Sequence, residues 1–471
     1  MRIALVHYHL RSGGVTSVIL NQARSLTAAG MDILIIAGEP PVRDGEFSFA
    51  LVSELAYDAH DAEFDARKIE SGAALLADGI IRAMKEHWGR EADIVHIHNP
   101  LIQKNTLLIP AIKTLAARGI KLFLQNHDLA EDFRPDVYTG QAEYPENCHY
   151  GVINSRDYNF LLASGLSTQG LHLIPNEVFP LTSRKGLRRT RFLYPVRAIR
   201  RKNIGEALLL SLFIPEGTTI AITLPASQKD DERYQRWRSL ASELNLPVEF
   251  ALGLQYSLEE LLGTSLCAIT TSVKEGFGFS FLEPWTAALP LFGRRIAYVC
   301  ADFEKSGIRF DHLYPSLDIP FDYVSDMLPG KLEAAIRRIY AAFAYEVPPA
   351  VLRELSEDMK NRDTADFGQL DEPMQETVIR KVFGNSDDRL AVRKLNPVLE
   401  VLADLSSSDD LIRANCKVIA GEYGQERITA LLLDIYGKVI GTPVIQKISK
   451  SALLKLFLTP RSLFLTGISD E

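Results

Sequence analysis

The chain of 471 residues is too long for a single ordinary hydrophobic core, so we expect two or three domains. Its formal net charge of −8 at pH 7 argues against a general nucleic-acid binder, because binding to a polyanion relies on an excess of Lys and Arg. The four cysteines lack metal-ligand spacing, and no window reaches about 18 consecutive apolar residues. The first apolar stretch is also too short for a signal peptide, so we expect a cytosolic protein with free thiols.

From the start of the chain, short runs rich in Ile, Leu and Val alternate with longer segments that carry apolar residues at helical spacing. The predicted strands are 2–8, 32–38, 93–98, 120–126 and 151–154, and the predicted helices are 14–29, 68–88, 104–118 and 155–164. Near-continuous apolar strands that alternate with helices indicate a parallel sheet covered on both faces. This series predicts a doubly wound, Rossmann-like domain over residues 1–180.

The same alternation restarts after 179–190, a polar and basic stretch of little periodicity that we interpret as the interdomain linker. The second series has predicted strands at 191–196, 218–224, 248–252 and 265–271, and predicted helices at 204–213, 229–243 and 257–263. We expect a second Rossmann-like domain over 191–423. In such sheets ligands bind outside the carboxyl ends of the strands, so the loops that follow the strands are where a site is expected.

The rest of the chain is mostly helical. Its predicted helices are 328–345, 348–360, 389–403, 409–421 and 424–436. The tail 447–467 is both basic and apolar, so two interpretations stand. We favour a helix packed back on the protein, because apolar stripes are usually core, over an amphipathic segment at a membrane surface.

The stretch 270–290 contains the most specific motif, a glycine-containing loop between a predicted strand and a predicted helix. Gly276 and Gly278 would let the backbone approach a ligand, and a helix N-terminus favours an anion. Glu275 in the loop and Glu283 in the first turns of the helix would accept charge-assisted hydrogen bonds from sugar hydroxyls. A dinucleotide fingerprint is excluded, because the third glycine of G-x-G-x-x-G is missing and such a motif should follow the first strand.

Two basic residues, Arg197 and Lys202, follow the first strand of the second series. They lie at the carboxyl edge, where we expect an anionic ligand, and the guanidinium fork and the ammonium point charge both suit phosphate. Their basic neighbours are more simply explained as a solvated linker. We therefore predict phosphate contact for this pair.

Histidines mark the strand ends of the first series. His7 with His9, and His96 with His98, form H-x-H pairs whose imidazoles share one face of a strand and could bind zinc. We favour packing and hydrogen bonding at the strand edge, because no fitting Cys or carboxylate partners are apparent. His127 could donate to a sugar hydroxyl or support a reacting centre, although a strand-end histidine bonded to the backbone is the simpler interpretation.

Together these motifs resemble the family 4 glycosyltransferases, which are retaining enzymes with the GT-B fold. The similar segments follow the order of the family and cover most of the chain: "SGGV" (12–15), "DIVHIHNP" (93–100), "NHD" (126–128), "LIPNEV" (173–178), "RAIRRKN" (197–203), "EGFGFSFLE" (275–283) and the helices of 415–436. The resemblance implies the α/β class with two Rossmann-like domains facing across a cleft. It also implies that C-terminal helices, over 424–471, cross back to the first domain.

The resemblance further implies a nucleotide-diphosphate sugar as co-substrate, UDP- or GDP-linked, with no cofactor and no metal. Arg197 and Lys202 would hold the diphosphate and stabilise the charge of the leaving group. Glu275 would contact the transferred sugar, Glu283 the ribose, and His127 the 6-position of the sugar. The implied donor-binding residues are Gly13, Gly14, Arg197, Lys202, Glu275, Gly276, Phe277, Gly278, Phe279, Ser280, Phe281 and Glu283. The catalytic residues would be His127, Glu275, Arg197 and Lys202, and the acceptor-binding residues His98, Asn99 and Asp128.

The sequence also departs from the family pattern. Val196 and Ala288 stand where glycine is usual, and Glu177 replaces a turn glycine. The segment 291–324 replaces the usual strand-and-glycine pattern. These changes spare the proposed donor contacts and place the chain on an unusual branch of the family pattern.

We therefore expect a retaining hexosyltransferase that acts on a hydroxyl of a sugar-like, small-molecule or lipid-linked acceptor. The alternatives are a metal-dependent hydrolase that uses the H-x-H pairs, and a non-catalytic subunit that binds a nucleotide sugar. The expected partners are the donor and the acceptor, with no nucleic acid. The expected location is the cytoplasm, peripheral at the membrane if 447–467 is exposed. The sequence does not determine the nucleotide base, the acceptor or the oligomeric state.

Overall fold

The computed structural model describes residues 1–11, 13–41, 46–58, 66–140, 143–360, 362–404, 409–459 and 463–467. It divides into two compact units: Met1–Glu177 with Glu422–Leu458, and Val178–Gly421 with Thr459–Glu471. We call them the first and the second unit. Ser12, in the predicted glycine motif, and residues 460–462 of the tail lie outside the described residues.

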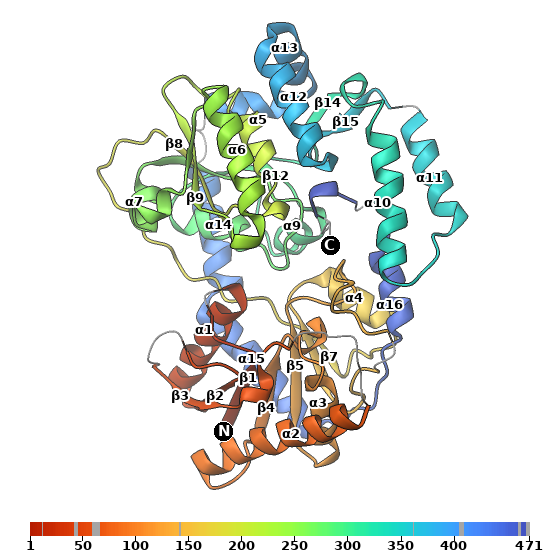
Figure 1. Ribbon diagram of the computed structural model, residues 1–471. Helices are drawn as coiled ribbons and strands as arrows, with labels where there is room; N and C mark the ends of the chain where they lie inside the picture. The colour runs from red at the N-terminus through yellow and green to blue at the C-terminus, as the bar shows by residue number, and fades with distance from the viewer. Residues whose placement is uncertain are drawn as a thin grey trace. The chain divides into compact units, whose positions relative to one another are not determined.

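The first unit contains a seven-stranded parallel sheet in the order β3-β2-β1-β4-β5-β6-β7 (Figure 1). Its strands are β1 (Arg2–His7), β2 (Asp32–Ala37), β3 (Ser48–Leu51), β4 (Ile94–His98), β5 (Leu122–Asn126), β6 (His149–Val152) and β7 (Leu171–Leu173). The parallel sheet expected from the sequence is confirmed. The edge strands β3 and β7 escaped prediction, because each is short and neither is a continuous buried apolar run.

Helices cover both faces of this sheet. They are α1 (Gly14–Ala28), α2 (Ala66–Trp88), α3 (Leu108–Ala117), α4 (Ser155–Ala163), α15 (Gln425–Gly441) and α16 (Lys450–Phe457). On one face α2 and α3 bury their apolar sides against β1, β2 and β4. On the other face α1 and α15, drawn in red and blue in Figure 1, share one apolar core. The C-terminal helices α15 and α16 therefore belong to the first unit, although the second unit separates them from it in the sequence.

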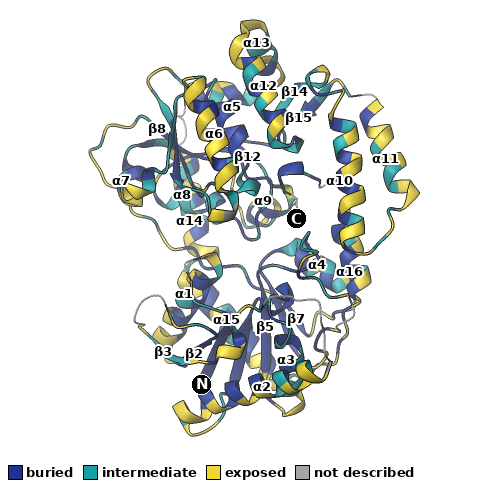
Figure 2. Ribbon diagram, viewed as in Figure 1, coloured by how far each residue is buried: buried dark blue, intermediate teal, exposed yellow. Residues whose placement is uncertain are grey.

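The second unit contains a six-stranded parallel sheet in the order β10-β9-β8-β11-β12-β13. Its strands are β8 (Arg191–Arg197), β9 (Thr219–Leu224), β10 (Val248–Phe250), β11 (Ser265–Thr270), β12 (Leu291–Arg294) and β13 (Leu313–Tyr314). Its helices are α5 (Ile204–Leu210), α6 (Asp231–Glu243), α7 (Leu258–Gly263), α8 (Glu283–Thr286), α9 (Ala297–Lys305), α10 (Leu328–Ala342), α11 (Pro349–Lys360), α12 (Glu372–Gly384), α13 (Ser386–Leu395) and α14 (Asp409–Glu422). An antiparallel pair, β14 (Asp318–Pro320) and β15 (Thr364–Asp366), completes it. In both units the central strands are buried, whereas most helices are buried on one side and exposed on the other (Figure 2).

Two predicted helices are broken in the structure. The predicted helix 389–403 is α13 followed by the 3-10 helix η9 (Pro397–Ala403), because Pro397 has no backbone N–H to continue the α-helical pattern. The helix expected near Phe279 consists of the 3-10 helix η6 (Phe279–Phe281) and the four-residue α8. Such short pieces have little macrodipole, so the anion preference expected of a helix N-terminus is weak here.

The order of the strands reverses beside β1 in the first sheet and beside β8 in the second. In open parallel sheets, ligands bind at the carboxyl edge beside such a reversal. The loops after β1 and β4, and those after β8 and β11, lie at these positions. All the residues predicted for the site follow β1, β4, β5, β8 or β11, or end the strand itself.

The structure shows the backbone conformation at two of the departures from the family pattern. Glu177 needs no glycine, because its φ is not positive, and its carboxylate accepts a hydrogen bond of 2.8 Å from the Ser25 hydroxyl. Ala288, in contrast, has a φ of 57°, in the left-handed region that favours glycine. Ala288 is therefore a strained position.

Most apolar side chains of α16 are covered by protein. Leu453, Leu454 and Phe457 of α16 are buried, and α16 packs against α4.

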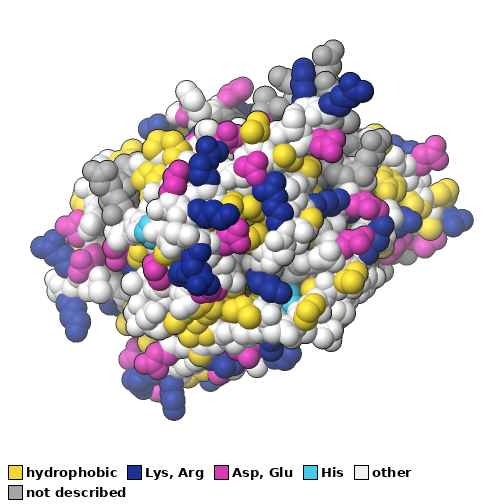
Figure 3. Space-filling model, turned by 90° about the horizontal axis from the view of Figure 1, so that it is seen from below, with side chains coloured by type: hydrophobic (Ala, Val, Ile, Leu, Met, Phe, Trp, Pro, Cys, Tyr) yellow, Lys and Arg dark blue, Asp and Glu magenta, His cyan; other side chains and the backbone are white. Residues whose placement is uncertain are grey.

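In the described part of the chain, no helix combines the length and the apolar character needed to cross a membrane. On the face drawn in Figure 3, the described Lys and Arg side chains alternate with Asp and Glu and form no continuous basic surface.

Candidate functional site

In the second unit, an ion pair joins the loops that follow β8 and β11. Lys202 Nζ donates a hydrogen bond to Glu275 Oε1, and Arg201 Nη1 lies 2.8 Å from Glu275 Oε2. Lys202 ends the 3-10 helix η3 (Arg200–Lys202), and Glu275 lies in the loop after β11. The structure thus brings together two of the four residues predicted as catalytic.

The two basic residues determine the charge of Glu275. Burial raises the pKa of its carboxyl, but the charges of Lys202 and Arg201 outweigh burial and lower the pKa to about 2. The side chain is only 8% exposed, so the carboxylate is ionised and largely shielded from water. Burial lowers the pKa of Lys202, and Glu275 opposes this shift. A buried pair of this kind needs both partners, because either charge alone would be poorly solvated.

Backbone contacts hold the two loops together behind the ion pair. The Tyr194 hydroxyl donates to the Lys202 carbonyl oxygen at 2.7 Å, and the Thr271 hydroxyl donates to the same oxygen at 3.0 Å. The Val273 N–H donates to the Arg201 carbonyl oxygen at 3.0 Å. These bonds orient the Lys202 side chain toward the loop that carries Glu275.

The glycine-containing loop turns sharply at Gly278. Its φ is 92°, and a Cβ atom there would lie 2.7 Å from Val299 Cγ1 and 2.8 Å from Phe281 Cδ2. The position therefore requires glycine. Phe277 and Phe281 point into the core, so their aromatic side chains are not available to a ligand.

Three other predicted donor residues differ in their surroundings. Arg197 is exposed, and its Nη1 donates a long hydrogen bond of 3.4 Å to the Pro225 carbonyl oxygen. The Ser280 hydroxyl is buried and has no hydrogen-bond partner among the described residues. Burial alone raises the pKa of the Glu283 carboxyl to about 7. These are the polar groups near the loop that a ligand could satisfy.

In the first unit, the predicted residues His98, Asn99, His127 and Asp128 form one cluster. Asn99 has a left-handed backbone with φ 59°, and its Oδ1 accepts hydrogen bonds from the N–H groups of His127 at 3.0 Å and of Asp128 at 2.9 Å. His98 Nδ1 lies 3.2 Å from His127 Nε2. Burial lowers the pKa of His127 to about 4 and that of His98 well below its usual value, so both rings are neutral at pH 7.

The H-x-H pairs are used in packing. The His96 and His98 rings stack with centroids 4.1 Å apart, and His96 Nδ1 lies 2.8 Å from the Tyr436 hydroxyl on α15. His7 Nδ1 donates to the His98 carbonyl oxygen at 3.1 Å. Over the described ranges, the structure contains no group of three or more His, Cys, Asp or Glu side chains placed to hold a metal ion.

Gly13 and Gly14 open α1 directly after the loop that follows β1. Gly13 is extended, with φ 174°, a conformation that any residue adopts. A Cβ atom would find no neighbour within 4 Å at Gly14 and only the Arg11 carbonyl oxygen, at 3.9 Å, at Gly13. The fold of the first unit therefore does not require these glycines, and the space beside them is open.

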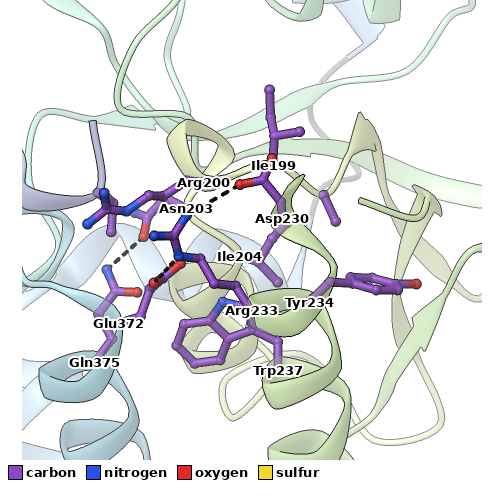
Figure 4. A pocket seen from close by; sticks show the side chains of 12 residues that line it. Ile199, Arg200, Asn203, Ile204, Asp230, Arg233, Tyr234, Trp237, Glu372 and Gln375 are labelled. Atoms are coloured by element: carbon purple, nitrogen blue, oxygen red, sulfur yellow. Dashed lines mark hydrogen bonds and ion pairs between the residues drawn. The ribbon is translucent and has the colours of Figure 1, made fainter. Parts of the chain in front are cut away.

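A small hollow lies beside the turn that contains Arg200 and Asn203 (Figure 4). It is lined by Ala198, Ile199, Arg200, Asn203, Ile204, Asp230, Arg233, Tyr234, Trp237, Glu372, Gln375 and Thr466. Its cavity volume of about 10 Å³ holds about one water molecule, far less than a nucleotide sugar needs. Gln375 Nε2 donates to Asn203 Oδ1 here at 2.7 Å, so the hollow backs the site rather than forming it.

Sequence reasoning missed three residues of the second-unit site. Arg201 lies in a run of basic residues, and no feature of its sequence context distinguishes it from its basic neighbours. Asn203 has the only local signal, since Asn is one of the few residues that tolerate the left-handed conformation, here with φ 52°. Tyr298 lies in the segment 291–324, and its hydroxyl donates to the Glu275 carbonyl oxygen, a contact with no sequence signal.

No protein-family model matches the chain. Mannosylglucosyl-3-phosphoglycerate synthase of Petrotoga mobilis is 27% identical over 320 residues, which are 59% of this chain and only 62% of the length of that relative. The structure is similar to sucrose-phosphate synthase from Thermosynechococcus elongatus, with a TM-score of 0.52, 14% identity and coverage of 93% of this chain and 98% of that one. It is also similar to Anabaena HepE in complex with UDP and glucose, with a TM-score of 0.55, 11% identity and coverage of 93% and 99%. The chain therefore has the GT-B fold of two Rossmann-like parallel-sheet domains.

Proposed function

We propose that this protein is a glycosyltransferase that moves a hexose from a nucleotide-diphosphate sugar to an acceptor hydroxyl, with retention and without a metal. The observation that carries the proposal is the Lys202–Glu275 pair, which lies where the strand order reverses in a GT-B fold. A cation and a carboxylate side by side suit the two halves of the donor. The ammonium suits the diphosphate, and the carboxylate suits the sugar hydroxyls.

In this proposal, Arg197 and Lys202 bind the diphosphate. Arg197 is exposed and only weakly engaged, so it is free to meet a phosphate at little cost. Lys202 would exchange part of its contact with Glu275 for a phosphate oxygen, and Arg201 would keep the Glu275 carboxylate compensated during this exchange. Both cations would stabilise the negative charge that develops on the leaving diphosphate.

The other predicted site residues would contact the sugar, the ribose or the acceptor. Glu275 would accept hydrogen bonds from the transferred sugar, and Glu283 from the ribose. His127 would contact the sugar as a neutral imidazole, because burial keeps its pKa near 4. Gly13 and Gly14 stay assigned to the donor, and His98, Asn99 and Asp128 to the acceptor side. We propose retention by same-face displacement, in which the leaving phosphate takes the proton of the acceptor hydroxyl.

The name of the Petrotoga relative suggests the class of acceptor. That protein is named for the synthesis of mannosylglucosyl-3-phosphoglycerate. We therefore propose a soluble glycosylated phosphoglycerate as the first acceptor to test, ahead of a lipid-linked one. The buried apolar side chains of α16 support this order, because they leave little apolar surface on that helix for a membrane.

The test is a transfer assay with purified protein. UDP-, GDP- and ADP-linked glucose and mannose are each incubated with glucosyl-3-phosphoglycerate, simple glycosides and a lipid-linked sugar, with and without EDTA. Mass spectrometry then detects the product, and nuclear magnetic resonance determines its anomeric configuration. We expect one donor to give a product with the configuration of the donor, and EDTA to leave the rate unchanged.

Other outcomes of the assay separate the alternatives. A donor that binds in calorimetry but is never consumed would identify a non-catalytic binding subunit. Activity abolished by EDTA and restored by zinc would identify a metal enzyme. The second result would conflict with the histidine geometry, in which the Nδ1 atoms of His7 and His96 contact a carbonyl oxygen and a tyrosine hydroxyl.

A further inference from the structure

The segment that replaces the family pattern, 291–324, contacts both sides of the Lys202–Glu275 pair. It supplies Arg294 at the end of β12, Tyr298 in α9 and Tyr314 at the end of β13. Arg294 and Tyr314 bond to Glu206, and the Tyr298 hydroxyl bonds to the backbone of Glu275, so these contacts would act on the pair through neighbouring groups.

On the Lys202 side, the contacts run through Asn203. Asn203 has φ 52°, a conformation that turns the chain sharply between Lys202 and α5. Its Nδ2 donates to Glu206 Oε2 at 2.8 Å. Its Oδ1 accepts from Gln375 Nε2 at 2.7 Å, a bond drawn in Figure 4. Two side-chain hydrogen bonds, one to Glu206 and one from Gln375, therefore stabilise the turn at Asn203 that directly follows Lys202.

Glu206 is in turn held by the replaced segment. Arg294 Nε lies 3.0 Å from Glu206 Oε1, and the Tyr314 hydroxyl donates to the same oxygen at 2.8 Å. Arg294 also pairs with Asp366 at 2.7 and 2.8 Å, and both Arg294 and Glu206 are almost fully buried. A buried network whose members are this fully paired is rigid, because each lost bond would leave a polar group unsatisfied.

On the Glu275 side, Tyr298 contacts the backbone directly. Its hydroxyl donates to the Glu275 carbonyl oxygen, and the Glu275 N–H lies 3.2 Å from the same hydroxyl. One phenol therefore engages both backbone polar groups of the residue that carries the carboxylate. This limits rotation of the loop at Glu275.

We propose that the segment 291–324 positions the Lys202–Glu275 pair, with Tyr298 acting on Glu275, and Arg294 and Tyr314 acting on Lys202 through Glu206 and Asn203. These are positioning residues, and their contribution to the reaction rests on the proposed function. The relative position of Lys202 and Glu275 depends on the contacts of both residues. Losing the contacts of either one would displace charged groups that must be placed against the donor to within about 0.5 Å.

The test uses two variants. One removes the hydroxyl contact to Glu275, and the other removes the side-chain hydrogen bonds of Asn203, each with little loss of packing. Tyr298→Phe removes only the hydroxyl. Asn203→Gly keeps the left-handed turn, which glycine adopts readily, but removes both side-chain bonds. Tyr345→Phe is the matched control, because the Tyr345 hydroxyl of the same unit has no hydrogen bond to any described residue.

The first readout does not depend on sugar transfer. Native protein is labelled briefly with acetic anhydride, and peptide mass spectrometry gives the acylation rate of Lys202 relative to the exposed Lys185. We expect slow labelling of Lys202 in the wild type and in Tyr345→Phe, and several-fold faster labelling in Tyr298→Phe and Asn203→Gly. Unchanged labelling in both variants overturns the positioning role, whatever the activity.

The second readout is transfer kinetics with the donor found in the screen. We expect kcat to fall roughly ten- to a hundredfold in both variants, because small misplacements of reacting groups cost that much, with a smaller change in KM. Faster labelling with an unchanged kcat would also overturn the inference. If the wild type transfers no sugar from any donor, the proposed function fails, while the labelling still decides whether the segment holds the pair. If Asn203→Gly does not fold, Tyr298→Phe alone decides.

Discussion

His98 Nδ1 lies 3.2 Å from His127 Nε2, and the two rings stack at an interplanar angle of 13°. In a contact between two neutral imidazoles, one nitrogen donates and the other accepts. His98 therefore couples its own tautomer to that of His127. If His127 contacts the donor sugar, its second nitrogen donates or accepts according to this contact.

The first prediction concerns the variant His98→Phe. Phenylalanine keeps a buried aromatic ring but removes the partner of His127 Nε2, and it also removes His98 Nε2, which has no partner among the described residues. We expect a stable protein whose kcat/KM for transfer falls about tenfold, the value of one lost hydrogen bond of about 1–1.5 kcal/mol. Steady-state kinetics and thermal unfolding measure the two effects.

A matched control exists in the same unit. His149 and His172 form a second stacked pair, with Nδ1 and Nε2 2.9 Å apart, on the neighbouring strands β6 and β7. His172→Phe should leave transfer unchanged. Equal losses in both variants would show that the effect is on folding rather than on His127.

The second prediction concerns Arg197. Because its side chain is exposed and makes only a long hydrogen bond, Arg197→Ala should leave the melting temperature unchanged. The loss of a phosphate contact should lower kcat/KM about 100-fold, the cost typical of removing one donor to a developing anion. Arg189→Ala, another exposed arginine of the second unit, is the control and should retain full activity. A fully active Arg197→Ala would remove this residue from the site.

The third prediction concerns the stability of the buried ion pair. Glu275→Gln leaves Lys202 without its counter-charge, so we expect the free energy of unfolding to fall by about 3 kcal/mol. The double variant Glu275→Gln with Lys202→Met removes both charges and should recover at least half of that loss. Urea unfolding at pH 7 measures both. If the double variant were as unstable as the single one, the pair would not be the cause.

The fourth prediction concerns Ala288, whose φ is 57°. Glycine reaches this region without strain, so Ala288→Gly should raise the free energy of unfolding by about 1 kcal/mol. Ala334→Gly, at an exposed position in the middle of helix α10, should lower it by about the same amount. The opposite signs of the two changes are the test, and a loss of stability in both would contradict the strain at Ala288.

The fifth prediction concerns the pH dependence caused by Glu283. Burial raises its pKa to about 7 in the folded protein, whereas an unfolded glutamate titrates near its usual pKa of about 4.3. Between these values the folded state holds more protons than the unfolded state, so this residue lowers the free energy of unfolding as the pH rises toward 7.

Glu283→Gln should therefore be more stable than the wild type at pH 8, by about 2–3 kcal/mol, and equal to it near pH 4.5. Denaturant unfolding at the two values of pH gives the difference. Ionised Glu283 should also accept the ribose hydroxyls, so UDP or GDP should bind the wild type more tightly at pH 8 than at pH 6. In calorimetry, Glu283→Gln should show no such dependence.

The sequence predicted the two parallel sheets, and it predicted the loops after β8 and β11 that carry Lys202 and Glu275. Long apolar runs such as β1 and β11 identify strands by composition alone, and the glycines of 275–283 identify the loop that follows β11. It failed on β3 and β7, because short strands at the edges of a sheet are partly exposed and lack a distinctive pattern. It also extended a helix through Pro397, where the structure has two.

Which side chains meet depends on contacts that are distant in the sequence. Tyr298 contacts a residue 23 positions away, and His96 contacts Tyr436 across 340 positions. No local pattern in the sequence predicts such contacts. They depend on the order of the strands in the sheet and on which helices pack against that sheet.

By itself, the sequence determined that this chain forms two parallel sheets and that glutamates and basic residues follow particular strands. Strand patterns and turn glycines depend on only a few neighbouring residues. They can therefore be identified from the sequence without knowing the fold. Only the tertiary structure decided that Lys202 and Arg201 neutralise Glu275, and that the unusual segment 291–324 lies beside that ion pair. An ion pair between two loops, and the contacts that stabilise it, form only when folding brings those loops together.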